Sequence, residues 1–175
     1  MSTPDFILEL RKHIGHMPLW LIGITAYVTD GDGRVLLGRR LDTGEWALVY
    51  GINEPAEDPA DTVAREVKEE TGVDVIPTDL VSVKASTRMV TYANGDQTQY
   101  LDLTYLCRLN PSGNTEPFVG DDENLGVGFF PLDHLPAPLA QSTVERMAYV
   151  REYLLNRAHG DAHAQFTFRG EIEHL

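Results

Sequence analysis

Apolar positions divide the first part of the chain into a helical segment followed by extended segments. Pro4 and the sequence FILELRKHIGH after it predict a short amphipathic helix. Residues 20–28 (WLIGITAYV) and 34–40 (RVLLGRR) are apolar and β-prone, with the turn-forming sequence TDGDGR between them. We therefore expect two strands joined as a hairpin. WALVYG at 46–51 predicts a further short strand.

The strongest helical signal lies between residues 58 and 72. Asp58 is a favourable N-cap residue, and Pro59 suits the first helical position. Gly72 is a natural residue to follow the helix C-terminus. On a helical wheel the apolar side chains form one face, which consists of Ala60, Val63, Ala64 and Val67. This face should pack against the rest of the fold.

The second half of the chain predicts a long β region followed by a helix. One alternating series predicts extended structure and consists of Val81, Val83, Ala85, Thr87, Met89 and Thr91. Asn94-Gly95 is a strong hairpin signal. Alternation over 101–109 and the apolar run VGFFPL predict two more strands. A final helix should begin with Ser142 or Thr143 as its cap. This order favours a mixed sheet with helices packed on it.

Composition and charge narrow the class of protein. The 175 residues are 42% hydrophobic and 23% charged, which is typical of one globular domain. Fourteen Lys and Arg against 27 Asp and Glu give a net charge of −13. That balance argues against nonspecific binding to nucleic acid or to an anionic membrane. The single cysteine, Cys107, excludes an intrachain disulfide and a Cys-rich zinc site, and we expect it in the core.

Targeting signals are absent from the sequence pattern. No run of about 18 apolar residues predicts a membrane span. The first residues, MSTPDFILELRKHIGH, lack the apolar stretch of a secretory signal. A cytoplasmic protein is therefore expected.

Three carboxylates share one stripe of the predicted helix, roughly 100° wide; they are Glu66, Glu69 and Glu70. Like charges at these spacings repel by a few tenths of a kcal/mol per pair. Hard oxygen ligands are what Mg²⁺ and Mn²⁺ require, so the stripe is a candidate metal site. Arg65 lies one turn before Glu69 and could brace it. An acidic helix face that is merely solvated is the alternative interpretation.

The spacing of residues around this helix is more specific than the stripe. Gly51, Glu57 and the segment REVKEETGV (65–73) fit G-x5-E-x7-R-E-U-x-E-E-x-G-U, where U is aliphatic, at every specified position. The sequence therefore resembles the Nudix hydrolase family and is MutT-like. The likeness runs from about Trp20 to about Leu155 and includes the sequence FFPLDHLP after the β region.

The resemblance implies a fold and a domain organisation. Members of the family have an α/β fold, an α/β/α sandwich around a central mixed β-sheet, with the motif as a loop–helix–loop. We expect a single Nudix domain over residues 1–175. Residues 1–15 would form an N-terminal helical extension, and residues 159–175 a C-terminal tail.

The resemblance also implies a metal-dependent activity. Glu66 and Glu70 would ligate Mg²⁺, or Mn²⁺ as a substitute, and Glu69 would ligate metal or orient water. Glu57 would join the outer shell, and Arg65 would hold the glutamates in place. A backbone carbonyl near Tyr50 or Gly51 would complete the site. The typical reaction is hydrolysis of a nucleoside diphosphate linked to another group: metal lowers the pKa of a bound water that attacks phosphorus, and a carboxylate accepts the proton.

The chain departs from the usual family pattern at two positions. Val49-Tyr50-Gly51 replaces the common Pro-Gly-Gly lead-in, and Ala56 replaces the Gly that often precedes the first motif glutamate. Neither change removes a ligand. Both could alter the shape of the loop, and Tyr50 could narrow a substrate pocket.

Further candidates lie outside the motif. Glu123, in the acidic sequence Asp121-Asp122-Glu123, is a candidate extra metal ligand or general base. Strand alternation should turn either Arg39 or Arg40 toward the sheet face beneath the helix, where it could bind a phosphate. Arg88 is a weaker phosphate candidate. Four aromatic residues could stack on a base, although core positions are the more common outcome: Trp20, Tyr27, Tyr92 and Phe118. His159 and His163 are expected at the surface.

Two other functions are alternatives to that of a pyrophosphohydrolase. A catalytically silent module that senses nucleotides or ADP-ribose would be expected to have lost motif carboxylates, and here all four stand. An isomerase-like relative would need extra Cys and Glu groups near the motif. Nucleoside triphosphates, ADP-sugars and dinucleoside polyphosphates all remain possible substrates. The expected partner is a small nucleotide rather than nucleic acid or membrane, and a homodimer through the N-terminal helix is possible.

Overall fold

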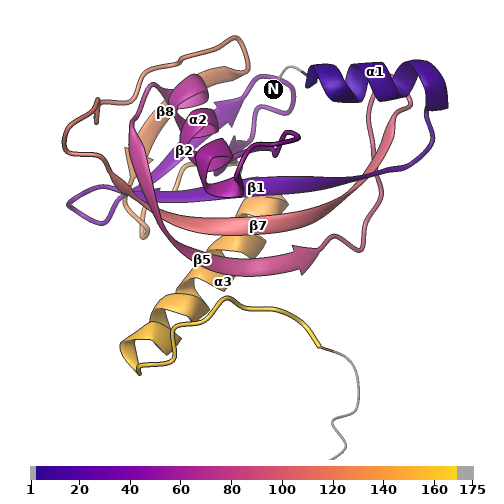
Figure 1. The fold of residues 1–175 in the computed structure, drawn as a ribbon. Coiled ribbons are helices and arrows are strands. Elements are labelled where there is room, and N and C mark those ends of the chain that lie inside the picture. The colour runs from indigo at the N-terminus through magenta and orange to yellow at the C-terminus, as the bar shows by residue number, and fades with distance from the viewer. Residues whose placement is uncertain (1–2, 169–175) are drawn as a thin grey trace, which may run out of the picture.

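The computed structural model describes residues 3–168, in which three helices flank a mixed sheet of eight strands (Figure 1). The helices are α1 (Asp5–Ile14), α2 (Pro59–Thr71) and α3 (Gln141–Ala158). The strands are β1 (Leu19–Thr29), β2 (Val35–Arg40), β3 (Trp46–Ala47), β4 (Val49–Ile52), β5 (Val75–Ala85), β6 (Val90–Thr91), β7 (Gln97–Leu109) and β8 (Asn124–Phe130).

The sheet is organised around β1, the long strand at its centre. The strand order is β3-β2-β1-β7-β5, with β4 added to β1, β6 to β7 and β8 to β2. β1 and β7 run parallel, from Leu19 opposite Thr98 to Thr29 opposite Arg108. Every other pairing among the described strands is antiparallel. The mixed sheet expected from the sequence is confirmed.

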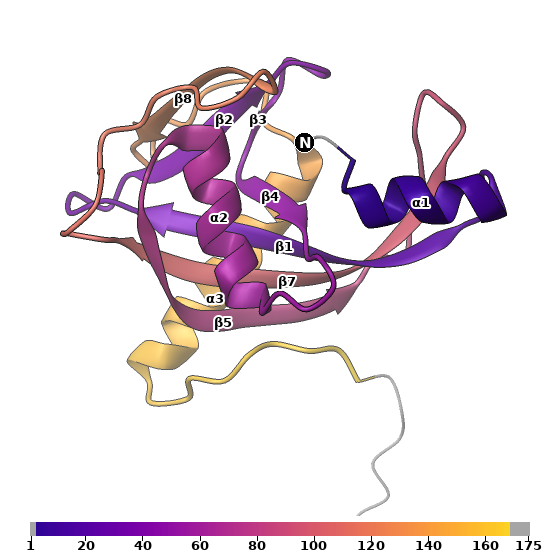
Figure 2. The ribbon, with the colours of Figure 1, turned by 45° about the horizontal axis from the view of Figure 1, so that its top comes forward.

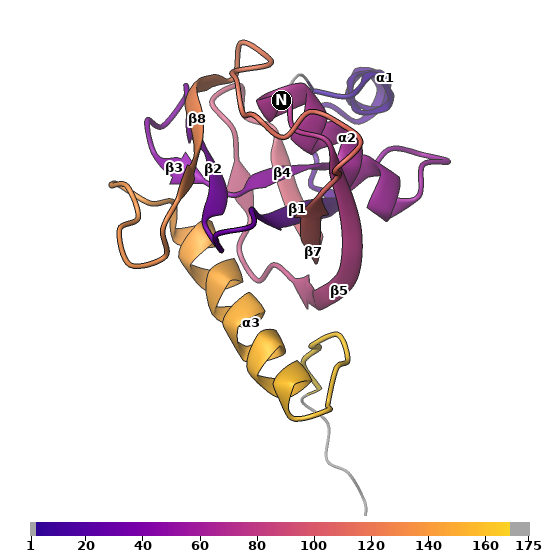
Figure 3. The same cartoon turned by 90° about the vertical axis from the view of Figure 1, so that its left-hand side faces the viewer.

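α2 and α3 cover opposite faces of this sheet (Figures 2 and 3). Successive side chains of a strand point to opposite faces, so β1 can supply both layers. Ile24 and Val28 pack with Val63 of α2, whereas Tyr27 packs with Val150 of α3. The α/β/α sandwich is confirmed, and Cys107 lies buried in the layer beneath α2.

The expected strand at 46–51 is two strands with different partners. β3 pairs with β2, and β4 pairs with β1. Between them, the backbone N–H of Leu48 donates to Oγ1 of Thr143 on α3, at 3.0 Å. Thr143 is therefore buried and occupied by this bond, and the predicted Ser142 or Thr143 cap is wrong, since the N-cap position belongs to Ala140.

The extended region predicted through Thr91 is also interrupted. β5 ends at Ala85, and Ser86 Oγ donates to the carbonyl of Arg88 at 3.0 Å. A local side-chain bond of this kind competes with strand pairing. Thr87 and Met89 consequently lie outside any strand, and only the short β6 resumes the sheet. β8 begins at Asn124, directly after the acidic sequence Asp121-Asp122-Glu123.

The predicted N-terminal helix is confirmed as α1. Its Ile7 is buried against Leu21 and Ile52, and Arg11 Nη2 donates to the carbonyl of Gln97 at 2.9 Å. Leu10 of this helix is 41% exposed. No helix within residues 3–168 has the length and apolar character to cross a membrane.

The C-terminal segment contacts the sheet edge through Gln165 and Thr167, and Lys84 Nζ of β5 donates to Thr167 Oγ1 at 3.1 Å. The N–H of Gln165 donates to Val81 O at 2.8 Å, and the N–H of Val83 donates to Gln165 O at 2.9 Å. The bridge therefore extends the sheet beside β5. The part of the expected tail after residue 168 lies outside the described residues.

The loop that carries the chain from β4 into α2 contains strained backbone. Ala56 has φ of +66°, and it is the non-glycine residue with positive φ in the described part of the chain. This is one of the two positions where the sequence departs from the family pattern. The left-handed region costs an L-residue with a Cβ roughly 1–2 kcal/mol. A glycine at this position would remove that cost.

We predict that Ala56→Gly stabilises the protein by about 0.5–1 kcal/mol. The substitution relieves backbone strain, and this gain is reduced by the greater conformational entropy of glycine in the unfolded chain. Ala56 is exposed, so no packing is lost. Urea unfolding with a shared m-value measures the change. Ala64→Gly, in the middle of α2, is the matched control and should destabilise by about 1 kcal/mol. Equal destabilisation by both variants would contradict the conclusion that the backbone at Ala56 is strained.

Candidate catalytic site

The packing of α2 buries some of its carboxylates and leaves others exposed. Asp58 occupies the N-cap position, although its side chain makes no cap bond, and Gly72 ends the helix with φ of +71°. Val63 and Val67 are fully buried, which turns the adjacent Glu66 and Glu70 toward the sheet with only 6% and 9% exposure. Glu66 and Glu70 are therefore not solvated, whereas the side chain of Glu69 is 56% exposed.

Arg65 connects three of the glutamates. It binds Glu57 through two bonds, Nε to Oε1 at 2.9 Å and Nη2 to Oε2 at 3.0 Å. Its Nη1 also donates to Glu66 Oε1 at 3.1 Å and to Glu69 Oε2 at 3.0 Å. The bonds with Glu57 raise the pKa of Arg65, and Arg65 lowers the pKa of Glu57. One guanidinium thus offsets repulsion within the cluster.

Glu66 lies against the backbone of β4. A Cβ atom on Gly51 would lie 2.2 Å from Cδ of Glu66, so only glycine leaves room for this carboxylate. Gly51 pairs with Ile24 of β1, which fixes the backbone there. Burial raises the pKa of Glu66 to about 7, with opposition from Arg65. Burying a carboxylate disfavours its charged form.

Glu70 is held from the other side by β8. Its Oε2 accepts a hydrogen bond from Asn124 Nδ2 at 3.2 Å. Asn124 itself lies close to β2, because a Cβ on Gly38 would be 2.5 Å from its Oδ1. Burial raises the pKa of Glu70 to about 7, and repulsion from Glu66 adds to the effect. Nothing in the sequence pattern singles out Asn124 except its place directly after the acidic residues 121–123.

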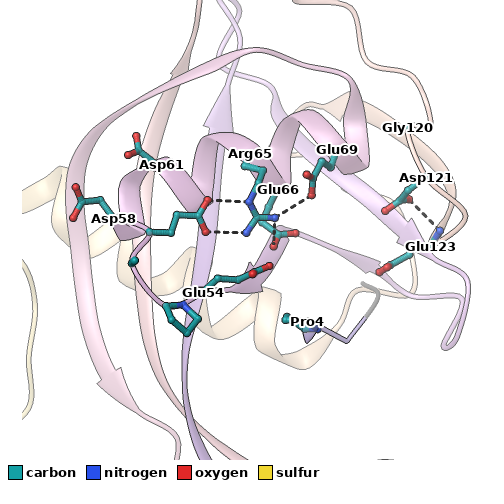
Figure 4. A pocket seen from close by; sticks show the side chains of 13 residues that line it. Pro4, Glu54, Asp58, Asp61, Arg65, Glu66, Glu69, Gly120, Asp121 and Glu123 are labelled. Atoms are coloured by element: carbon teal, nitrogen blue, oxygen red, sulfur yellow. Dashed lines mark hydrogen bonds and ion pairs between the residues drawn. The ribbon is translucent and has the colours of Figure 1, made fainter. Parts of the chain in front are cut away.

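An open cleft of about 1010 Å³ runs beside this face of α2 (Figure 4). Carboxylates dominate its lining: Glu54, Glu57, Asp58, Asp61, Glu66, Glu69, Asp121 and Glu123. Arg65 is the cation among the lining residues. An anionic substrate could enter only with added cations that reverse this charge.

Glu123 reaches the cleft from the loop before β8, as the sequence predicted for a nearby carboxylate. Its carbonyl accepts from the N–H of Leu41 at 2.8 Å. Its N–H donates to Asp121 Oδ1 at 3.0 Å. Glu69 and Glu123 therefore line one cleft from separate elements.

The donor set suits a hard divalent cation. Within residues 3–168, no three His, Cys, Asp or Glu side chains already converge on a metal position. Arg65 engages Glu57 and Glu69 in ion pairs. Glu66 and Glu70 nevertheless present two buried carboxylates whose desolvation a cation would relieve, and oxygen-only ligands are those that Mg²⁺ takes. These two could hold the metal.

The two arginines at the end of β2 have different contacts. The pairing between β2 and β8 shifts register between Arg39 and Arg40. Arg39 is exposed and donates from Nε to Gly44 O at 3.1 Å. Arg40 instead lies with its guanidinium carbon 4.9 Å from the centre of the Tyr50 ring, and both Arg40 and Tyr50 interact electrostatically with Glu70. Burial raises the pKa of Tyr50 to about 12, so its phenol stays neutral.

The remaining sequence candidates differ from one another in exposure. Arg88 is exposed in the connection between β5 and β6. Of the aromatic residues expected in the core, only Tyr27 is buried; the sequence expectation is wrong for Trp20, Tyr92 and Phe118, which are 46–58% exposed. His159 and His163 are exposed, as expected.

Comparison with known proteins agrees with this geometry. The family model described as the NUDIX domain matches residues 20–152. A MutT-like protein of Streptomyces ambofaciens is 37% identical over 125 residues, covering 71% of this chain and 72% of that protein. A MutT NUDIX hydrolase structure from Burkholderia pseudomallei has a TM-score of 0.61 and 29% identity, covering 75% of this chain and 98% of the other. An ADP-ribose pyrophosphatase from Streptococcus suis has a TM-score of 0.57 and 28% identity, covering 83% and 96%.

We predict that the metal-free protein loses stability as pH rises from about 5 to 8. The pKa values of Glu66 and Glu70 rise from an unfolded 4.5 to about 7, so the folded state binds more protons than the unfolded state in this window. Their contribution is complete below pH 4.5 and lost as pH passes 7. Thermal unfolding in EDTA measures it.

Two controls accompany this titration. Glu70→Gln should reduce the pH slope, because one of the two groups no longer titrates. Mg²⁺ should also reduce it, since a cation favours the charged carboxylates. A melting temperature independent of pH between 5 and 8 in EDTA would contradict the predicted linkage.

Proposed function

Because the chain belongs to the Nudix hydrolase family, whose members act on nucleoside diphosphate-linked substrates and generally use divalent metals, we propose that it is a Mg²⁺-dependent pyrophosphohydrolase. Its substrate would be a nucleoside diphosphate linked to another group. The observation that best supports this proposal is the burial of Glu66 and Glu70 on one helix face beside an acidic cleft. Burial of two neighbouring carboxylates is costly without a cation to pair with them.

In this proposal Glu66 and Glu70 hold Mg²⁺, with Mn²⁺ as a possible substitute. Glu69 and Glu57 support them, together with a backbone carbonyl near Tyr50 or Gly51. When bound, the metal supplies charge neutralisation of the diphosphate and an acidified water. Asn124 orients Glu70 by its hydrogen bond.

The other residues of the chain have separate proposed roles. Arg65 keeps Glu57, Glu66 and Glu69 in place through its bonds. Glu123 accepts the proton of the attacking water, with Glu69 as the alternative acceptor on the same cleft. Arg40 contacts a substrate phosphate, and Tyr50 shapes the pocket beside it. Arg39 points to Gly44 and has no role in this site.

The substrate is proposed only as a class. The similarity to an ADP-ribose pyrophosphatase and to MutT proteins leaves ADP-sugars and nucleoside triphosphates, including damaged ones, as candidates beside dinucleoside polyphosphates. A small nucleotide fits an acidic cleft that holds metal ions better than nucleic acid or a membrane surface does. A single Nudix domain over 1–175, a cytoplasmic location and a homodimer remain predictions from the sequence.

A module that senses nucleotides without cleaving them is the alternative. The four motif glutamates stand and are positioned by Arg65, Gly51 and Asn124, which favours catalysis. The isomerase-like alternative loses support because Cys107 is buried in the core beneath α2.

We predict that a nucleotide panel with Mg²⁺ yields hydrolysis that Glu70→Gln lowers more than about 100-fold, since loss of an outer partner to a metal ligand alone commonly costs 10–100-fold. Product analysis by anion exchange identifies the bond that is cleaved. Glu152→Gln, an exposed carboxylate on α3, is the control and should leave the rate unchanged. Tight nucleotide binding by the wild type with no turnover would instead support the sensing module.

Glu123→Gln should lower kcat by about 10²–10⁴-fold, the usual contribution of a general base, while KM changes little. Glu69→Gln should lower kcat less, because Glu69 is only the alternative acceptor in this proposal. The pH profile of kcat separates the two, since loss of the base removes the acidic limb. The reverse order of effects would assign the proton acceptor to Glu69.

A further inference from the structure

Two guanidinium groups from distant parts of the chain meet at one aromatic ring. Tyr50 of β4 has the guanidinium carbon of Arg40, at the end of β2, 4.9 Å from its ring centre. The guanidinium carbon of Arg146, on α3, lies 5.6 Å from the same centre. A cation near an aromatic ring at these distances is attracted by the electrons of the ring. Tyr50 therefore brings together two cations that would otherwise repel each other.

Each arginine is also anchored by a single carboxylate. Nε and Nη2 of Arg40 donate to Asp42 at 2.8 and 2.6 Å. Nε of Arg146 donates to Asp102 Oδ2 at 2.6 Å, and Asp102 Oδ1 accepts from Thr25 Oγ1 at 3.1 Å. Within residues 3–168, both Nη groups of Arg146 and Nη1 of Arg40 make no hydrogen bond. Donors are therefore left for an external anion.

The position of this pair gives it a functional context. Arg40 and Tyr50 both interact electrostatically with Glu70, which relates the Arg40 end of the pair to the buried carboxylates of α2. The side chains of Arg40 and Arg146 are 26% and 18% exposed, which keeps them ordered yet reachable. Among the described residues that line the acidic cleft, Arg65 is the only cation, and glutamates already engage its guanidinium.

We propose that Arg40 and Arg146 together form a second anion subsite, which binds a phosphate of the substrate beyond the diphosphate held at α2. Tyr50 is its positioning residue. A guanidinium group can donate two parallel hydrogen bonds to the oxygens of a phosphate. Two guanidinium groups therefore suit an additional phosphate, which is charged, better than a sugar, which is neutral. The subsite thus favours nucleoside triphosphates and longer polyphosphates over ADP-sugars. This inference rests on the proposed function for its substrate and names Arg146 as the new specificity residue.

Kinetics with paired substrates test the selectivity. Arg146→Gln should raise KM for a nucleoside triphosphate about tenfold or more, and should change KM for ADP-ribose less than about twofold. Values of kcat should move little, because Arg146 lies outside the metal cluster. Arg151→Gln, an exposed arginine on the same helix, is the matched control and should leave both KM values unchanged. Equal KM changes for the two substrates would overturn the proposal.

A binding measurement separates this proposal from the hydrolase proposal. Calorimetry with inorganic tripolyphosphate in EDTA should detect binding to the wild type and about tenfold weaker binding to Arg146→Gln, whether or not the protein hydrolyses anything. Tyr50→Phe keeps the ring and should bind as the wild type does. Tyr50→Leu removes the ring and should bind more weakly. No binding by the wild type, or equal binding by all variants, would overturn the subsite.

The ion pair with Asp102 requires one more control. Arg146→Gln alone leaves Asp102 without its cation, and the fold could be weakened for that reason. The double variant Arg146→Gln with Asp102→Asn removes both charges, and its melting temperature reports whether the fold is intact. The proposal requires this double variant to be as deficient in tripolyphosphate binding as Arg146→Gln. Recovery of wild-type binding would show that Arg146 acts only by balancing Asp102.

Discussion

The burial of two like-charged carboxylates on one helix is the constraint around which this fold is arranged. Val63 and Val67 fix the rotation of α2, and that rotation leaves Glu66 and Glu70 facing the sheet. Every neighbouring element then contributes to their accommodation. Arg65 supplies charge, β4 supplies space at Gly51, and β8 supplies the amide of Asn124. The packing of Val63 and Val67 in the core holds α2 in this position.

Much of this could be predicted from sequence because the decisive signals are local. The α2 helix, its apolar face and the pairing of Arg65 with Glu69 follow from spacing within a few turns. The hairpin between β1 and β2 is likewise bounded by its own turn residues. A motif with fixed spacing adds the family and the layer architecture, and the comparisons confirm both.

The rest depends on contacts between distant residues. Nothing near Leu48 indicates that its N–H is satisfied by Thr143, which lies 95 positions later and ends the strand predicted at 46–51. Asn124 and Arg146 lie in segments whose local pattern predicts a loop and an amphipathic helix. Their meeting with Glu70 and Tyr50 is set by the order of strands in the sheet. Trp20 of β1 is 56% exposed, which the apolar run at 20–28 does not reveal.

The contact between Gly51 and Glu66 has a consequence for how such sequences diverge. The two residues are 15 positions apart, yet they share one volume, and a methyl group added to the first would occupy the place of the second's carboxylate. The two positions are therefore expected to change together. A homologue that has shortened or lost the side chain of Glu66 can acquire a side chain at position 51, whereas a side chain at position 51 is blocked while Glu66 is present. Enlargement at position 51 would thus serve as a marker that a descendant has abandoned the ancestral chemistry.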